Sequence, residues 1–178
     1  MTNYKILLFF FLMSFGLVYP SIAKQDGIVT GLSLPRYVTL KSNEVKLRVG
    51  PGKNYKTIYI YKCINYPVKI IAEFDNWRKV EDVEGTVGWI HQNLISGVNY
   101  AIIKKNILLS KKKLAYSLPA DESLLFKAPD ENSQPIAKFK FNVIAKIITC
   151  EKEWCKLKHG NFTGWIRKIN LWGVKGGA

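Results

Sequence analysis

The sequence predicts an all-β fold of two tandem small barrels, because it contains an alternating strand, a series of turn signals and a repeat. Apolar and basic residues alternate over 45–49, which is the period-two pattern of a half-buried strand. Gly50-Pro51-Gly52 ends that strand, because proline lacks the N–H that a strand ladder needs and glycine tolerates positive φ.

Four further apolar runs complete the first unit, and no helical pattern lies among them. Five short strands within about fifty residues are typical of a small barrel. We expect the stretch 35–40, which holds Tyr37, Val38 and Leu40, to pair at the edge of this barrel. The four runs are Thr57–Cys63, Val68–Phe74, Trp77–Val80 and Thr86–Ile90.

A set of short motifs in the first unit resembles the bacterial SH3 (SH3b) family over residues 36–97. The motifs are Leu47–Gly52, Tyr55, Trp77 and Gly88-Trp89-Ile90. The resemblance implies that the Gly-Pro turn opens a long first loop and that the Gly-Trp-aliphatic triplet forms the fourth strand. It also implies a groove beside that loop, which in this family holds short peptides, often peptidoglycan stem or bridge peptides.

The same motifs recur later in the chain at nearly constant spacing. Trp77–Val80 returns as Trp154–Leu157 at an offset of 77, and Gly88–Ile90 returns as Gly164–Ile166 at an offset of 76. Such agreement indicates a duplicated unit. The second copy departs from the family at its opening, where Ala128-Pro129-Asp130 replaces the Gly-Pro-Gly turn and no loop tyrosine follows. The resemblance therefore leaves open whether the second copy has a working groove.

The predicted organisation is a signal segment over 1–23, a first barrel over 35–97, a basic connecting segment over 98–120 and a second barrel over 121–178. The connecting segment holds five lysines but also apolar residues, which argue against a free linker. We therefore expect one or two strands there that pack the barrels together, with a basic turn at Lys111–Lys113.

Residues 1–23 have the pattern of a secretory signal. Lys5 supplies the positive start, Ile6–Val18 is the apolar run, and Ser21-Ile22-Ala23 is a small-x-small cleavage site. The alternative is a retained membrane anchor. The run of 13 residues extends only ~20 Å as a helix, short of the ~30 Å hydrocarbon core of a bilayer, and this favours cleavage.

The chain is strongly basic. Its 178 residues include 27 Lys and Arg against 13 Asp and Glu, a formal net charge of +14. Such a charge attracts anionic envelope polymers, lipid head groups or nucleic acid, or it simply reflects a lysine-rich composition. Export argues against nucleic acid, and the spread of lysines over both repeats favours the compositional explanation.

Four aromatic residues of the first barrel are the candidate ligand-binding residues: Tyr55, Tyr59, Trp77 and Trp89. The alternative for each is a place in the barrel core, where aromatic side chains usually pack. Tyr55 is the best candidate for exposure, because a loop aromatic has less core to pack against. We expect Trp89 to be a core residue whose replacement by alanine unfolds the barrel.

Cys150 and Cys155 are predicted to form a disulfide. They bracket a turn at 151–154, so they stand opposite each other in a hairpin. At an offset of 77 they match Glu73 and Arg78, an opposite-charge pair suited to neighbouring strands. A secreted compartment permits oxidation, and the alternative is two reduced core thiols. Cys63 is left over, and we expect it to be buried and inert.

Catalysis and metal binding have little support in the sequence. His91 and His159 have no partner at metal-ligand spacing, and the carboxylates at 73, 75, 81, 82 and 84 are expected to solvate turns. A Cys63–His91 nucleophile pair stays open, since such partners meet only in the fold. We expect no cofactor, no metal and no enzymatic activity.

We therefore predict an exported, non-enzymatic binding module of the periplasm or cell envelope that recognises peptidoglycan peptide or an envelope protein through an SH3b groove. Aromatic stacking supplies affinity and lysines steer anionic ligands. One alternative is a scaffold that binds only a protein partner, and another is a cell-wall hydrolase that uses Cys63 and His91. We expect no nucleic-acid partner and no membrane span after signal cleavage.

Cleavage after Ala23 leaves Lys24 as the first residue of the exported protein. N-terminal sequencing of protein recovered from the cell envelope is expected to begin at Lys24. An intact Met1 on protein from the cytoplasm would contradict export, and with it the argument for an oxidised cysteine pair.

Overall fold

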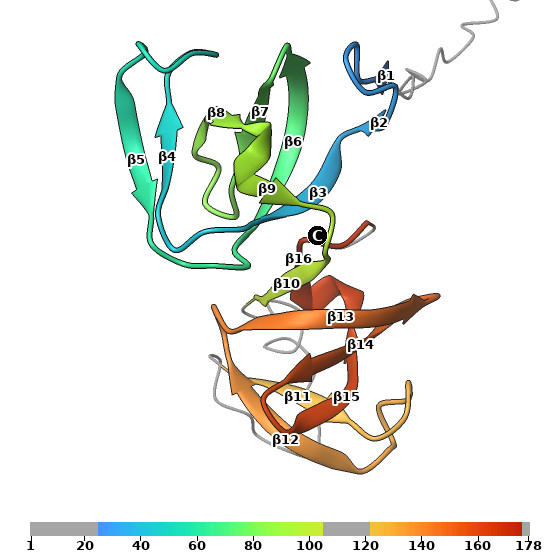
Figure 1. Cartoon of the computed structure of the whole chain (residues 1–178). Helices are drawn as coiled ribbons and strands as arrows, with labels where there is room; N and C mark the ends of the chain where they lie inside the picture. Colours follow the sequence, from blue (N-terminus) through green and yellow to red (C-terminus); the bar gives the residue numbers. More distant parts are fainter. Residues whose placement is uncertain (1–24, 105–121, 176–178) are drawn as a thin grey trace, which may run out of the picture.

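The computed structural model describes residues 25–104 and 122–175, and they form two seven-stranded antiparallel sheets (Figure 1). The predicted all-β fold of two barrels is thereby confirmed. The expected signal segment 1–23 and the basic turn at Lys111–Lys113 lie outside the described residues. Within the described ranges, no helix is long and apolar enough to cross a membrane.

The first sheet has the strand order β5-β4-β8-β7-β6-β3-β9. Strands β4 to β8 are the five expected from the sequence. The expected edge strand, β3, instead lies between β6 and β9, because the chain returns after the 3-10 turn η1 (Gln92–Leu94) and pairs along its outer side. The strands are β3 (Arg36–Leu40), β4 (Val45–Arg48), β5 (Thr57–Tyr61), β6 (Pro67–Phe74), β7 (Trp77–Glu81), β8 (Val87–His91) and β9 (Ile95–Ser96).

The second sheet repeats this arrangement in the order β12-β11-β15-β14-β13-β10-β16, which is the first order with seven added to each label. The duplication read from the motif spacing thus extends to the topology. Strand β10 begins this sheet well before the expected boundary at 121, so part of the connecting segment belongs to the second barrel. The strands are β10 (Tyr100–Ile103), β11 (Glu122–Phe126), β12 (Pro135–Lys140), β13 (Ile144–Glu151), β14 (Trp154–His159), β15 (Phe162–Arg167) and, after η2 (Lys168–Asn170), β16 (Leu171–Trp172).

Each barrel closes where two strands come into contact, β4 with β8 in the first barrel and β11 with β15 in the second. A Cβ on Gly88 of β8 would lie 2.9 Å from the Arg48 carbonyl oxygen of β4 and 2.5 Å from Leu47 Cγ. The same closeness recurs at Gly164 of β15, where a Cβ would lie 2.7 Å from the Phe126 carbonyl oxygen. Only glycine fits, and this is the physical reason for the Gly-Trp-aliphatic triplet in both copies.

The two barrels meet at β10 and β16, the strands of the second sheet that lie nearest the first barrel (Figure 1). Ile102 of β10 is 2% exposed and pairs with Trp172 of β16, and the Trp172 ring stands edge-on to Tyr37 of the first barrel at 5.2 Å. The matching pair in the first sheet is Thr39 and Ser96. The second copy has therefore replaced two hydroxyl residues with apolar ones that pack against its neighbour.

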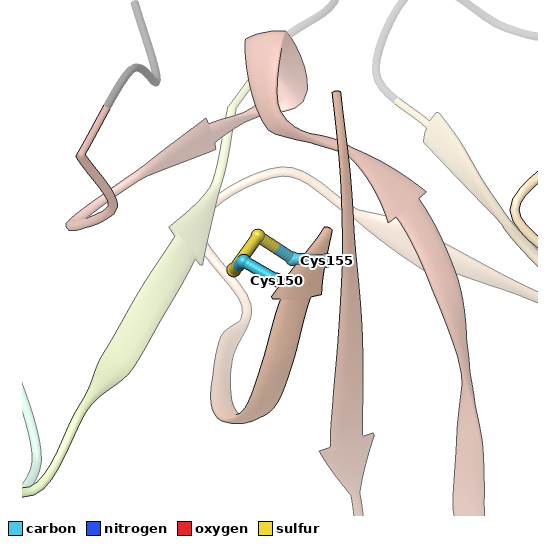
Figure 2. The surroundings of a disulfide bond; sticks show 2 residues. All are labelled: Cys150 and Cys155. Atoms are coloured by element: carbon cyan, nitrogen blue, oxygen red, sulfur yellow. A yellow bond between two sulfur atoms is a disulfide. The ribbon is translucent and has the colours of Figure 1, made fainter. Parts of the chain in front are cut away.

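One cross-strand position holds an ion pair in the first barrel and a disulfide in the second. Glu73 lies opposite Arg78, with 3.6 Å between Arg78 Nε and Glu73 Oε1. Cys150 lies opposite Cys155, and a disulfide joins the two (Figure 2). The turn between them is Lys152–Glu153, shorter than the expected 151–154, because a φ of +46° at Lys152 closes a tight hairpin.

Glu73 is buried and clamps a short N-terminal hairpin, β1 (Gln25–Asp26) with β2 (Ser33–Leu34), onto the first barrel. Its carboxylate accepts hydrogen bonds from the Val29 N–H (3.1 Å), the Thr30 N–H (2.9 Å) and the Thr30 hydroxyl (2.7 Å), and it pairs with the Arg36 guanidinium. The expectation that Glu73 solvates a turn was wrong, because residues 25–34 fold back over it. Burial by itself would raise the pKa of Glu73, but the hydrogen bonds from Thr30, Arg36 and Val29 lower it to about 2.

The disulfide is expected to stabilise the second barrel alone. A Cys150→Ser, Cys155→Ser double variant should lose about 2 kcal/mol of unfolding free energy, because the short loop is no longer closed in the unfolded chain. Differential scanning calorimetry should show an earlier transition for the second barrel. Alkylation of the denatured, unreduced protein should label Cys63 alone of the three cysteines, and labelling of all three would show a reduced pair.

Acid is expected to weaken the first barrel through Glu73. Its folded pKa of about 2 lies below the ordinary value of 4.5, so its stabilisation is complete above pH 4.5 and is lost as the pH falls toward 2. Glu73→Gln should remove this pH dependence and cost about 3 kcal/mol at neutral pH, because Arg36 and Arg78 lose their buried counter-ion.

The matched control is Glu81→Gln, which removes a half-exposed carboxylate 2.8 Å from Lys69 and should cost less than about 1 kcal/mol. Thermal unfolding followed between pH 2 and pH 7 measures both variants. Equal losses in the two would contradict the clamp.

Candidate functional site

The outer face of β4, β8 and β7 carries two tryptophans, a histidine and several basic side chains of the first barrel. Strand register places Trp89 of β8 between Arg48 of β4 and Lys79 of β7, and it places Trp77 of β7 opposite His91 of β8. Alternate residues of these strands, such as Val80 and Ile90, are fully buried and face the core. Since side chains alternate along a strand, the aromatic and basic set faces outward.

A cleft of about 270 Å³ lies on this face. Trp77 is 9% exposed at its wall, and the His91 ring stands edge-on to it at 5.3 Å. The His91 Nδ1 accepts a hydrogen bond from the Asn93 N–H at 3.3 Å, which orients the imidazole. The lining residues are Glu44, Lys46, Arg48, Lys53, Trp77, His91 and Leu94, so three permanent cations face one carboxylate.

Tyr55 lies on the loop beside the cleft, as expected, and is 49% exposed. Its ring covers Gly50, where any Cβ would collide with the ring atoms. The Arg48 guanidinium donates to the Tyr55 carbonyl oxygen at 2.7 Å and so ties this loop to β4. The glycines of the turn are therefore required by the tyrosine that packs over them, as well as by the end of the strand.

The other three candidates divide between two faces. Trp77 and Trp89 share the outer face, although only Trp77 lines the cleft. Trp89 is half-buried and lies outside the core cluster, so the expectation that it is a core residue was wrong. Tyr59 is 51% exposed, and its ring lies 4.8 Å from that of Tyr61. Because Tyr59 pairs with Leu47, which faces inward, its side chain lies on the opposite face of the sheet from the cleft.

The sequence analysis did not select Lys46, Arg48, Lys53 or Leu94 as cleft residues. A signal for two of them was present, because Lys46 and Arg48 are the polar members of the alternating strand and must share one face. Lys53 and Leu94 come from a loop and a 3-10 turn, where periodicity carries no information about direction.

On the matching face of the second barrel, aromatic and basic side chains pack on one another. Phe126 replaces Arg48 and lies opposite Trp165 of β15. The Phe126 ring stands edge-on to the ring of Trp154 of β14 at 5.8 Å. Arg167 replaces His91 and lies over the Trp154 ring at 5.7 Å, held by Glu131 at 2.9 Å. Lys156 lies 5.9 Å above the Trp165 ring. Both tryptophans thus have cation–π or ring partners from their own barrel, as Trp77 has in His91.

Cys63 is exposed, so the expectation of a buried thiol was wrong. It lies in the loop between β5 and β6, where its thiol donates to the Ile64 carbonyl oxygen at 3.5 Å. In the part of the chain that the structure describes, no hydrogen bond joins Cys63 to His91, and no three His, Cys, Asp or Glu side chains gather closely enough to hold a metal ion.

Fold and site together describe a tandem pair of small barrels, the first of which carries an aromatic and cationic cleft. The model of the bacterial SH3 domain family matches residues 41–97 and 120–173, and the chain belongs to this family, with two copies of the domain. The match confirms both the resemblance read from the first barrel and the second copy inferred from the repeat.

Three solved structures show a distant likeness. NlpC1 and NlpC2 from Trichomonas vaginalis are 13% and 14% identical, with TM-scores of 0.33 and 0.32, and the match covers 77% and 78% of this chain and 45% and 48% of theirs. An NlpC/P60 family protein from Bacillus cereus is 10% identical, with a TM-score of 0.31, 76% of this chain covered and 55% of that chain. The chain thus spans about half the length of these structures. A search of curated proteins found no match.

Proposed function

We propose that the protein is an exported, non-enzymatic binding module of the cell envelope, and that the cleft beside Trp77 in its first barrel binds peptidoglycan peptide. Bacterial SH3 domains typically bind cell-wall peptides and are usually extracellular or envelope-associated. The Cys150–Cys155 disulfide suits an oxidising compartment. The secretory pattern of residues 1–23 supports export in the same way.

The observation that carries the proposal is the difference between the two equivalent faces. In the first barrel Trp77 borders an open cleft, whereas in the second barrel Phe126 and Arg167 occupy the space over Trp154. A binding module needs aromatic surface whose partner is the ligand rather than its own chain. The first barrel offers the small exposed part of Trp77, beside the His91 ring, together with three cationic side chains that line the same cleft.

The chemistry of the cleft favours a short peptide that carries carboxylates. The indole of Trp77 offers apolar contact to aliphatic side chains and to the flat faces of amides. Arg48, Lys46 and Lys53 offer charge-assisted hydrogen bonds to carboxylate groups. Peptidoglycan peptides combine these two features, and so do acidic segments of envelope proteins, which make the alternative ligand.

A pull-down on purified sacculi tests the cleft. Trp77→Ala should reduce retention about tenfold, because it removes the aromatic wall. The matched control is Trp154→Ala, which makes the same truncation at the equivalent position of the second barrel and should leave retention unchanged. Thermal midpoints of both variants separate lost binding from lost folding.

A second pair of variants avoids the packing change. Lys53→Glu places an opposite charge at the exposed rim of the cleft and should weaken retention. Lys158→Glu makes the same change at an exposed position of β14 in the second barrel and should leave retention unchanged. Equal retention of all four variants would contradict the assignment of the cleft. Failure of the unaltered protein to bind sacculi would instead favour a scaffold with a protein partner, and lysis in a zymogram would favour the hydrolase.

A further inference from the structure

Strand β5 forms one edge of the first sheet and exposes apolar side chains along its length. In the described part of the chain it pairs only with β4, so its other backbone groups face outward without a strand partner. Ile58, Tyr59 and Ile60 are 45%, 51% and 41% exposed. Its far end is firmly held, because the buried Tyr61 hydroxyl donates to Asp82 at 2.9 Å. An unpaired, apolar and well-anchored edge is a template for another strand.

The equivalent edge of the second barrel, β12, is protected against such pairing. It begins with Pro135, which has no N–H to donate. Ile136 packs against the second core, and Lys138 stands where the first barrel has Ile60, with its ammonium 3.9 Å from Glu122. Two strands with one topology thus have opposite edge character, so the fold itself does not require an apolar edge at β5.

Charge selects among the strands that β5 can accept. Lys56 and Lys62 flank β5 and are exposed, and Lys46 and Arg48 of β4 lie opposite Ile60 and Thr57. In an antiparallel pair of two β5 strands centred on Tyr59, Lys56 of each copy would stand opposite Lys62 of the other. Like charges in that arrangement are destabilising, and a chain of formal net charge +14 resists self-association generally.

We propose that β5 is a docking edge that adds one extended strand from a protein partner with alternating apolar residues and carboxylates at its ends. The backbone of β5 supplies the hydrogen bonds, Ile58 and Ile60 supply the apolar contacts, and the flanking lysines pair with the carboxylates. Ile58 and Ile60 do not line the cleft beside Trp77, so this edge is a second surface, although Lys46 and Arg48 lie between the two and line the cleft as well.

The probe is a synthetic peptide with a Val-Thr-Val-Thr centre and two glutamates at each end, added to the full chain. Backbone amide exchange followed by NMR should slow at residues 57–61 and not at 135–140. Ile60→Lys, which copies the second barrel, should weaken binding about tenfold, since it removes an apolar contact and places a hydrated ammonium against the apolar centre of the peptide. Ile148→Lys makes the same change at another exposed isoleucine (51% exposed) and should leave the affinity unchanged.

Three outcomes would overturn the proposal. One is unchanged exchange at residues 57–61 in the presence of the peptide. Another is equal binding of a peptide in which lysines replace the glutamates, which would remove the role of charge. The third is a dimer in sedimentation that Ile60→Lys dissociates, which would make a second copy the occupant. Retention of Ile60→Lys on sacculi is expected to stay normal, so this test and that of the cleft fail independently.

Discussion

The close approach of two strands at a glycine holds each barrel together. Gly88 lies so near Leu47 and the Arg48 carbonyl oxygen that a Cβ cannot be placed there, and Gly164 stands in the same relation to β11. This contact fixes which residues of β4 and β8 face inward. Because side chains alternate along a strand, it also decides that Trp89, Arg48 and His91 face outward. The cleft is a consequence of that closure.

Duplication of this frame has let the two barrels diverge at a few positions. The hairpin that carries an ion pair in the first barrel carries a disulfide in the second. The position of Arg48 at the cleft is taken by Phe126, which packs on its own tryptophan. At the junction, Ile102 and Trp172 turn a polar strand pair into an apolar contact. These changes distinguish the two barrels at one hairpin, one face and the junction between them.

The N-terminal hairpin shows how a local charge can order a segment that has no periodicity. Ile28, Val29 and Leu32 stay exposed in this segment, but the Glu73 carboxylate binds the backbone N–H groups of Val29 and Thr30. Arg36 and Arg78 neutralise that carboxylate. A buried charge with several donors is far less costly than a bare one, so a single glutamate both caps the barrel and holds the chain that enters it.

The sequence by itself determined the strands, the turns, the duplication and the pairing of Cys150 with Cys155, because these depend on short-range periodicity and on a constant offset between two copies. It did not determine that Glu73 is buried, that Cys63 is exposed or that Trp89 lies outside the core. Those outcomes depend on which distant segment covers each side chain. Burial is a property of packed strands, and only the tertiary structure decides which strands pack.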